Sequence, residues 1–154
     1  MFLQNLRAKI GARLNGDSEG GFTLIELLVV MLILGILAAI AIPAFFNQRD
    51  KGTDAQAKAA VRTAQTAIET YATDNGGSYA GAEAADLQGI EDTLVIAAGE
   101  DNVITVPLAN ETEYTVSSES GTGTDFEITR EGGVVTFSCA PEEGGCPTGG
   151  DWSQ

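Results

Sequence analysis

An uninterrupted stretch of apolar residues dominates the first third of the chain. Residues 27–46 contain no charged side chain, and the nearest charges on either side are Glu26 and Arg49. As an α-helix that rises about 1.5 Å per residue, this segment would be about 30 Å long, which matches the hydrocarbon core of a bilayer. The pattern therefore predicts a helix that crosses a membrane once.

The apolar pattern changes to a helical stripe after residue 46. Small and apolar residues recur there at intervals of three and four, which places them on one face of a helix. The stripe consists of Ala57, Ala60, Val61, Ala64, Ala67, Ile68, Tyr71 and Ala72. Residues 74–77 have the sequence Asp-Asn-Gly-Gly, which favours a helix end. We therefore expect one nearly unbroken helix over residues 22–73, with an amphipathic second half.

Apolar and polar residues alternate in the C-terminal part of the chain, as is typical of strands. The alternating segments are residues 114–116, 126–128 and 135–137, separated by turn sequences at 120–123 and 131–133. Residues 103–106 have the composition of a further short strand, which we expect Pro107 to end. The prediction is an α+β fold, in which an antiparallel sheet of three or four strands packs on the amphipathic helix.

The segment between the predicted helix and sheet, residues 75–112, is rich in small and acidic residues. Asp86 is placed to cap a short helix that includes Leu87, Ile90 and Leu94. We therefore interpret this segment as a connecting region that holds one short helix.

The charge of the chain is strongly asymmetric. The sequence contains 8 Lys and Arg against 22 Asp and Glu, for a net charge of -14 at pH 7. After residue 62, Arg130 is the one basic residue against seventeen acidic residues. A domain with this charge repels phosphate backbones, which disfavours direct nucleic-acid binding. We interpret the acidic clusters at residues 100–102 and 142–143 as solvated surface, with cation binding as the alternative.

The sequence lacks the common catalytic and metal-binding patterns. It contains no histidine, which removes the commonest general base and a common metal ligand. It also has no phosphate-binding glycine loop and no calcium loop of EF-hand spacing. We therefore predict that the protein is not an enzyme and has neither a cofactor nor a metal site.

The two cysteines, Cys139 and Cys146, enclose six residues. Their number and spacing fit neither a zinc site within one chain nor a redox Cys-X-X-Cys motif. A structural disulfide is the favoured interpretation, and closing so short a loop stabilises by about 2–3 kcal/mol on the chain-entropy model. Such a bond suits an oxidising compartment outside the cytoplasm.

The residues just before the apolar stretch have a pattern of their own. Gly20-Gly21-Phe22-Thr23-Leu24-Ile25-Glu26 resembles the prepilin processing site of type IV pilins and pseudopilins. The resemblance implies that a prepilin peptidase cuts on the cytoplasmic side after Gly21 and methylates the new amino terminus of Phe22. Residues 1–21 would be a leader peptide, and the apolar helix would stay in the mature protein. The alternative is an uncleaved tail on a single-pass anchor.

Four parts follow from the pattern and the resemblance together. They are a leader peptide (1–21), a transmembrane and assembly helix (22–46), an amphipathic helix (47–74), and a head domain with connecting loop, sheet and disulfide loop (75–154). Basic residues are balanced on the two sides of the span, so their distribution does not orient it. The cytoplasmic placement of the N-terminus rests on the resemblance and on the cysteine pair.

Two residues of the expected span need a specific explanation. A carboxylate in an apolar helix is unfavourable unless it is paired, and the resemblance implies that Glu26 pairs with the Phe22 amino terminus of a neighbouring subunit. Pairing with its own Phe22, or complementing the helix dipole, are the alternatives. Pro43 removes one helical hydrogen bond, which predicts either a static kink or a site where the helix loosens during assembly.

The resulting prediction is a structural subunit of a type IV pilus filament, a polymer of the chain with itself. The implied partners are prepilin peptidase, the pilus assembly machinery of the inner or cytoplasmic membrane, and membrane lipid before assembly. The subunit would be a single-pass membrane protein first and part of a cell-surface pilus afterwards. The alternatives are a pseudopilin of a type II secretion or competence system, and an uncleaved membrane-anchored binding protein. Motility, adhesion and DNA uptake are equally compatible with the sequence.

Overall fold

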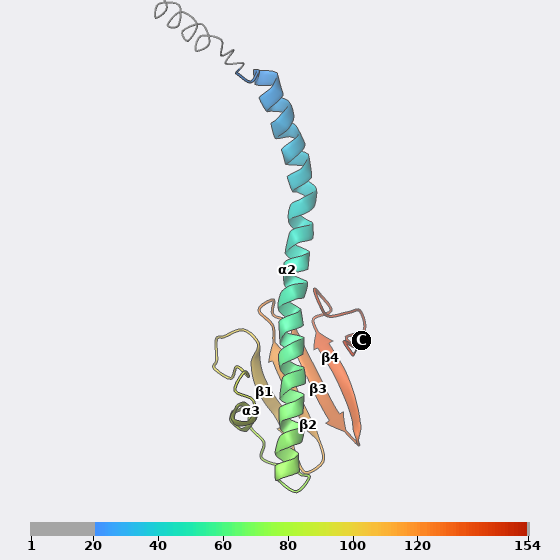
Figure 1. Cartoon of the computed structure of the whole chain (residues 1–154). Coiled ribbons are helices and arrows are strands. Elements are labelled where there is room, and N and C mark those ends of the chain that lie inside the picture. Colours follow the sequence, from blue (N-terminus) through green and yellow to red (C-terminus); the bar gives the residue numbers. More distant parts are fainter. Residues whose placement is uncertain (1–20, 154) are drawn as a thin grey trace, which may run out of the picture. The chain divides into compact units, whose positions relative to one another are not determined.

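The computed structural model describes residues 21–153, so the expected leader lies outside the described residues except for Gly21. The described residues form one long helix, one short helix and four strands (Figure 1). Their bounds are α2 Leu24–Asp74, α3 Ala84–Ile90, β1 Val103–Ala109, β2 Tyr114–Glu119, β3 Asp125–Glu131 and β4 Val134–Ala140. The chain forms two compact units, which meet between Ile42 and Pro43.

In the first unit, the N-terminal part of α2 carries an apolar surface that the described residues leave exposed. Every large apolar side chain from Phe22 to Ile42 is exposed. By length and composition, α2 meets the requirements of a helix that crosses a membrane. Because water solvates such a surface poorly, lipid or other apolar helices are its favourable surroundings.

In the second unit, the four strands form an antiparallel sheet in the order β1-β2-β3-β4. Figure 1 shows the C-terminal part of α2 crossing one face of this sheet, with α3 beside β1. Alternation along β2 turns Tyr114, Val116 and Ser118 inward, where all three are buried. The predicted α+β fold is thus confirmed, with four strands.

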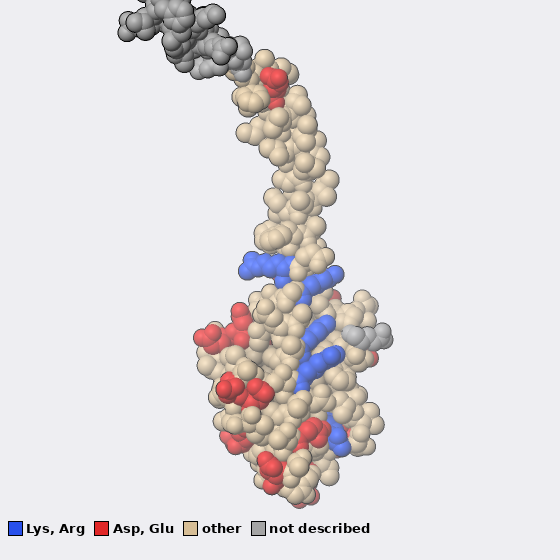
Figure 2. All heavy atoms as spheres, viewed as in Figure 1, with Lys and Arg blue, Asp and Glu red and all other residues tan. Residues whose placement is uncertain are grey.

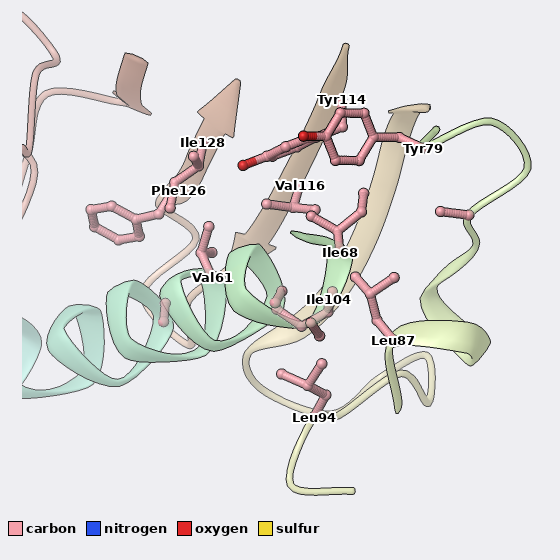
Figure 3. Packing of buried hydrophobic residues seen from close by; sticks show 14 of the residues in the cluster. Val61, Ile68, Tyr79, Leu87, Leu94, Ile104, Tyr114, Val116, Phe126 and Ile128 are labelled. Atoms are coloured by element: carbon pink, nitrogen blue, oxygen red, sulfur yellow. The ribbon is translucent and has the colours of Figure 1, made fainter. Parts of the chain in front are cut away.

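The hydrophobic core lies between α2 and the sheet. The residues of the predicted helical stripe are all buried or half-buried. Small side chains on the helix face large ones from the strands, including Tyr114, Val116, Phe126 and Ile128 (Figure 3). Because most of the stripe is alanine, the helix packs close to the sheet and the strands supply the bulk of the core.

The course of β1 differs from the sequence prediction. The strand does not end at Pro107 but continues to Ala109, and its register against β2 shifts between Thr105 and Leu108. Proline cannot donate a ladder hydrogen bond, and it is tolerated in a strand at an edge or a bulge. β1 meets both conditions, so the expectation that Pro107 ends the strand is wrong.

The short helix also differs from the prediction in detail. α3 ends at Ile90, and Leu94 is buried beyond its end. Asp86 is not the cap residue, because it lies inside the first turn of α3. There its carboxylate accepts a hydrogen bond from the backbone N–H of Glu83 at 2.9 Å.

The C-terminal segment completes the core beside β4. Cys139 forms a disulfide with Cys146, as predicted. The Trp152 side chain is 1% exposed, and its indole N–H donates to the Ser138 carbonyl at 2.7 Å. Its ring packs edge-on against Phe126 and Phe137, with centroids 5.7 and 5.1 Å away. The disulfide loop therefore leads into a tail that belongs to the core.

Candidate functional site

The N-terminal end of α2 has a capping box. Thr23 precedes the first residue of the helix, and its hydroxyl oxygen accepts the backbone N–H of Glu26 at 3.3 Å. In return, the Glu26 carboxylate accepts the backbone N–H of Thr23 at 2.7 Å. The sequence Thr-Leu-Ile-Glu has the Thr-X-X-Glu spacing that this reciprocal arrangement requires. Glu26 therefore stabilises the start of its own helix.

The Glu26 carboxylate keeps one oxygen free of these bonds. The Thr23 hydroxyl and backbone N–H both donate to Oε2, each at 2.7 Å. No hydrogen bond reaches Oε1 from any residue of 21–153. The same carboxylate can thus cap its helix through Oε2 and accept a further donor through Oε1.

The two residues of the predicted cleavage site lie before the helix. Gly21 and Phe22 are both exposed, and the Phe22 side chain is 82% exposed. A Cβ atom added at Gly21 would have no atom of the described residues within 4 Å. Gly21 is thus exposed, with open space at the position where a side chain would begin.

Pro43 lies inside α2, and the helix continues through it. Because proline has no backbone N–H, the Ala39 carbonyl receives no hydrogen bond from this position. A static kink and a loosening during assembly both stay predictions for Pro43.

A buried carboxylate on α2, Asp54, holds two loops of the second unit. Its side chain is 0% exposed. Its Oδ1 accepts hydrogen bonds from the hydroxyls of Ser120, at 2.7 Å, and Thr122. Its Oδ2 accepts the backbone N–H of Gly145 at 2.6 Å. One side chain thus joins the helix to the β2–β3 turn and to the disulfide loop.

Two cations follow Asp54 along the helix and lie over aromatic rings. The Lys58 ammonium donates to the Gly145 carbonyl at 2.6 Å and lies 5.1 Å from the centre of the Phe126 ring. The Arg62 guanidinium lies 5.4 Å from the Trp152 ring centre. Burial lowers the pKa of Lys58 from its ordinary value, and the nearby Asp54 carboxylate opposes this shift. These contacts fasten the C-terminal tail to α2.

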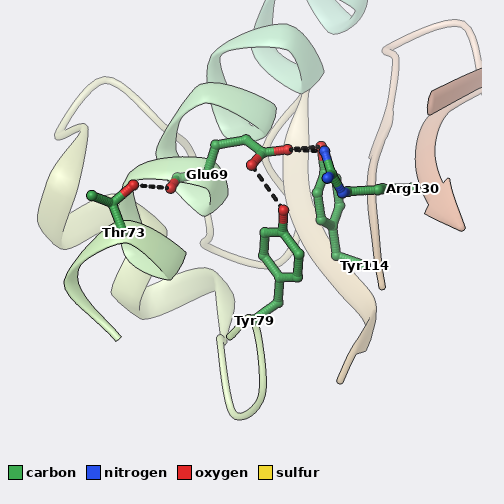
Figure 4. A network of polar contacts seen from close by, with 5 residues as sticks. All are labelled: Glu69, Thr73, Tyr79, Tyr114 and Arg130. Atoms are coloured by element: carbon green, nitrogen blue, oxygen red, sulfur yellow. Dashed lines mark hydrogen bonds and ion pairs between the residues drawn. The ribbon is translucent and has the colours of Figure 1, made fainter. Parts of the chain in front are cut away.

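Glu69 forms a second polar anchor near the other end of the helix (Figure 4). Its carboxylate accepts the hydroxyls of Tyr79, at 2.8 Å, and Tyr114, at 3.1 Å. It also forms an ion pair with Arg130 at 3.3 Å. Burial raises the pKa of both tyrosines above their ordinary value, and the Glu69 carboxylate adds to the increase. The anchor ties α2 to the loop after it and to β2 and β3.

Sequence reasoning missed both anchors, although one left a signal. Asp54 precedes Ala57 and Val61 at intervals of three and four, so it lies on the apolar stripe itself. An acidic residue at such a position is expected to be buried and paired. Glu69 gave no comparable signal, because two of its three side-chain partners, Tyr114 and Arg130, lie 45 and 61 residues away.

The described residues contain no cluster suited to a metal ion. Between residues 21 and 153, no group of three or more Cys, Asp or Glu side chains is arranged to hold one. Two features of the described residues stand out. One is the exposed apolar part of α2, in which Glu26 is the single carboxylate from residue 22 to residue 42. The other is the second unit with its two polar anchors, which we call the head from here on.

Comparisons with known proteins give one match over most of the chain and several shorter ones. A family model described as the prokaryotic N-terminal methylation motif matches residues 17–42. The type IV wide pilus major component PilA4 of Thermus thermophilus is 33% identical over 125 residues, which cover 80% of this chain and 83% of that protein. The type II secretion system core protein G of Pseudomonas aeruginosa is 40% identical over 57 residues, which cover 37% of this chain and 40% of that protein.

A third relative matches over a short length. The type IV major pilin protein PilA of Myxococcus xanthus is 45% identical over 51 residues, or 33% of this chain and 23% of that protein. No solved structure matches the chain. The matches to protein G and to PilA thus span less than half of those relatives, whereas the match to PilA4 spans most of both chains.

Proposed function

Since the chain belongs to the type IV pilin family, we propose that it is the structural subunit of a pilus filament. The observation that carries this proposal is the exposed apolar helix, in which Glu26 is the single charge from residue 22 to residue 42. Packing such helices together in a polymer removes their apolar surface from water once they leave the bilayer. The family consists of structural subunits, and the proposal includes no catalytic step.

The proposed maturation begins with prepilin peptidase. The enzyme cuts after Gly21, removes residues 1–21 as a leader and methylates the amino group of Phe22. The match to the methylation motif over residues 17–42 supports this step, and so does the accessible backbone at Gly21. Before assembly, the subunit lies in the membrane, with its N-terminus in the cytoplasm and the disulfide-bonded head outside.

Cleavage changes the surroundings of Glu26. The Phe22 nitrogen becomes a positively charged amine, and methylation leaves it basic. We propose that Glu26 Oε1, which accepts no hydrogen bond in residues 21–153, receives the amine of a neighbouring subunit. This contact neutralises two charges in apolar surroundings and sets the register of the growing polymer. Lipid surrounds the helix before assembly, and the pilus assembly machinery of the membrane moves the subunit into the filament.

Two substitutions at Glu26 separate its two roles. Glu26→Gln keeps an acceptor for the Thr23 N–H, because glutamine also completes a capping box, but it carries no charge. Glu26→Ala removes both functions. We expect both variants to lose surface filaments, since a neutral amide does not compensate the amine. Normal filaments from Glu26→Gln would limit this residue to capping its own helix.

The first test of the function is mass spectrometry of the N-terminal peptide from material sheared off cells. A peptide that begins at N-methylated Phe22 is the expected result. A peptide that begins at Met1 and is found in membranes alone would contradict the proposal and indicate an uncleaved anchor for a binding protein. In that case Glu26→Ala should also leave the amount and location of the protein unchanged.

A pseudopilin of a type II secretion or competence system is the second candidate. The 40% identity to core protein G over 57 residues favours it, whereas the longer match to PilA4 favours a pilin. Deletion of the chain distinguishes the two. Loss of surface fibres with normal protein secretion is expected of a pilin, and loss of secretion without loss of surface fibres is expected of a pseudopilin.

A further inference from the structure

Three cations form a stripe along one side of α2 in the head. Lys51, Lys58 and Arg62 follow one another at intervals of seven and four, which places them on one side of a helix. In Figure 2, blue side chains follow the line of α2, with red side chains to its sides. We call Lys51, Lys58 and Arg62 the basic stripe. Arg49 lies about half a turn away from this side, because successive residues are separated by about 100°.

The basic stripe has no acidic partner at ion-pair distance. Within residues 21–153, the single ion pair joins Arg130 to Glu69. Lys58 and Arg62 lie over aromatic rings, and Lys51 is exposed. The chain carries 22 acidic residues, so this absence reflects how the charges are arranged and not a shortage of acids. Lys58 is half-buried and donates to the Gly145 carbonyl, so Lys51 and Arg62 are the exposed members of the stripe that a partner with negative charge can reach.

Negative charge is concentrated in a hollow elsewhere on the head. The hollow has a volume of about 640 Å³ and is lined by residues of the segment before β1, of β1, of the end of β2, of the β2–β3 turn and of the start of β3. Four acidic residues line it, namely Glu100, Asp101, Glu119 and Asp125. None of these four forms an ion pair with a described lysine or arginine. We call this feature the acidic hollow.

The stripe and the hollow lie toward opposite edges of the sheet. The sheet order is β1-β2-β3-β4, so β1 and β4 are its two edges. Arg62 contacts the ring of Phe137 on β4, with 5.9 Å to the ring centre. Val103 and Thr105 of β1 line the hollow. No residue of the basic stripe lines the acidic hollow, and no ion pair joins the two surfaces among the described residues.

We propose that the basic stripe of one subunit docks against the acidic hollow of the next. A contact between two different surfaces of identical chains is heterologous, and repetition of it produces an open polymer. Unlike charges guide the two heads together and fix their register. The contact also offsets the mutual repulsion of strongly acidic subunits, since the full chain has a net charge of -14. The inference rests on the proposed filament and names the surfaces through which its heads meet.

The test uses single charge reversals in the full-length chain. Lys51→Glu alters the stripe, and Glu100→Lys alters the hollow. Arg49→Glu reverses an exposed cation off the stripe, and Glu142→Lys reverses an exposed acid of the disulfide loop, so each variant has a control with the same change in charge. The fifth variant combines Lys51→Glu with Glu100→Lys. The readout is the yield of filaments sheared from cells, normalised to total subunit.

We expect about a tenfold lower yield from Lys51→Glu and from Glu100→Lys, because each places like charges against each other at every repeat of the contact. The combined variant should recover most of the wild-type yield, and the two controls should assemble normally. All substituted side chains are exposed, so we expect the unfolding temperature of each variant in detergent to match that of the wild type.

Two results would overturn the inference and leave the proposed function intact. If wild-type chains form filaments and the combined variant is as defective as the worse single variant, the stripe and the hollow do not meet. If Lys51→Glu reduces the unassembled subunit in membranes while Glu100→Lys has no effect, the stripe binds anionic lipid headgroups instead. Absence of filaments from the wild-type chain would reject the proposed function itself.

Discussion

Removal of the Asp54 carboxylate should destabilise the head more than any other single loss of a polar group. Asp54→Ala leaves the Ser120 hydroxyl, which is buried, and the Gly145 N–H, which is half-buried, without their acceptor. It also removes the contact between α2 and the exposed Thr122. The replacement is small, so the loss of hydrogen bonds dominates over any strain.

The magnitude follows from these contacts. A hydrogen bond to a charged group contributes about 1.5–3 kcal/mol, and a buried polar group left without its partner costs about 1–3 kcal/mol. Water can reach Thr122 and partly Gly145, which reduces their share. We therefore expect Asp54→Ala to lower the free energy of unfolding by about 3–4 kcal/mol. For a domain of this size, the unfolding temperature should fall by roughly 12–16 °C.

The assay is thermal unfolding of the full-length chain in detergent, followed by fluorescence of Trp152. This residue is the sole tryptophan and is 1% exposed, so it reports loss of the head's core. Asp50→Ala is the matched control, because Asp50 lies one turn earlier on α2 and its side chain accepts no hydrogen bond from residues 21–153. We expect that control to change the free energy of unfolding by less than about 0.5 kcal/mol. A loss below about 1 kcal/mol in Asp54→Ala, or an equal loss in Asp50→Ala, would refute the reasoning.

Three further predictions concern the same domain. In Gly145→Ala, the new Cβ would lie 2.7 Å from Asp54 Cβ, so we expect the free energy of unfolding to fall by about 1–3 kcal/mol. Gly52→Ala is the control: its new Cβ would have no atom within 4 Å, so the same thermal unfolding assay should show no change or a gain in stability. Replacing both cysteines with serine should lower the unfolding free energy by about 2–3 kcal/mol, and the variant should no longer respond to a reducing agent. Burial raises the pKa of Tyr114 in the folded state. The protonated hydroxyl therefore stabilises the fold fully below pH about 10, and this stabilisation is lost as the pH rises through the folded-state pKa. We expect the unfolding temperature to fall above pH about 10, and to fall less in Tyr114→Phe.

The backbone architecture was predictable because it depends on local periodicity. Spacings of three and four along residues 57–72 placed one face of α2 against the sheet, and alternation over residues 114–137 identified three of the four strands. The disulfide followed from two cysteines with six residues between them. Each of these signals lies within a short stretch of sequence, so reading them required no knowledge of how distant segments meet.

The polar anchors were not predictable, because their partners are distant along the chain. Ser120 and Gly145 lie 66 and 91 residues after Asp54, and Arg130 lies 61 residues after Glu69. A stripe pattern indicates that a residue such as Asp54 faces inward, but it does not identify the donors that meet it. The same limit applies to the acidic hollow, which gathers residues from two separate segments, 98–105 and 117–125.

The edges of the sheet bear on how copies of the chain can join. An exposed edge strand offers unpaired backbone groups to another chain, which is a route to polymers by strand addition. Here the Ile104 N–H of β1 donates to the Val95 carbonyl at 2.7 Å, and Pro107 removes a donor further along the same edge.

The β4 edge is covered in a similar way by the C-terminal tail. The Cys139 N–H donates to the Gly150 carbonyl at 2.8 Å, and the Ser138 carbonyl accepts the indole N–H of Trp152. Strand addition at either edge would have to displace these contacts, and on the β4 side it would also expose a buried tryptophan. The apolar part of α2 and the exposed charged side chains of the head, by contrast, can meet another copy without displacing such backbone contacts.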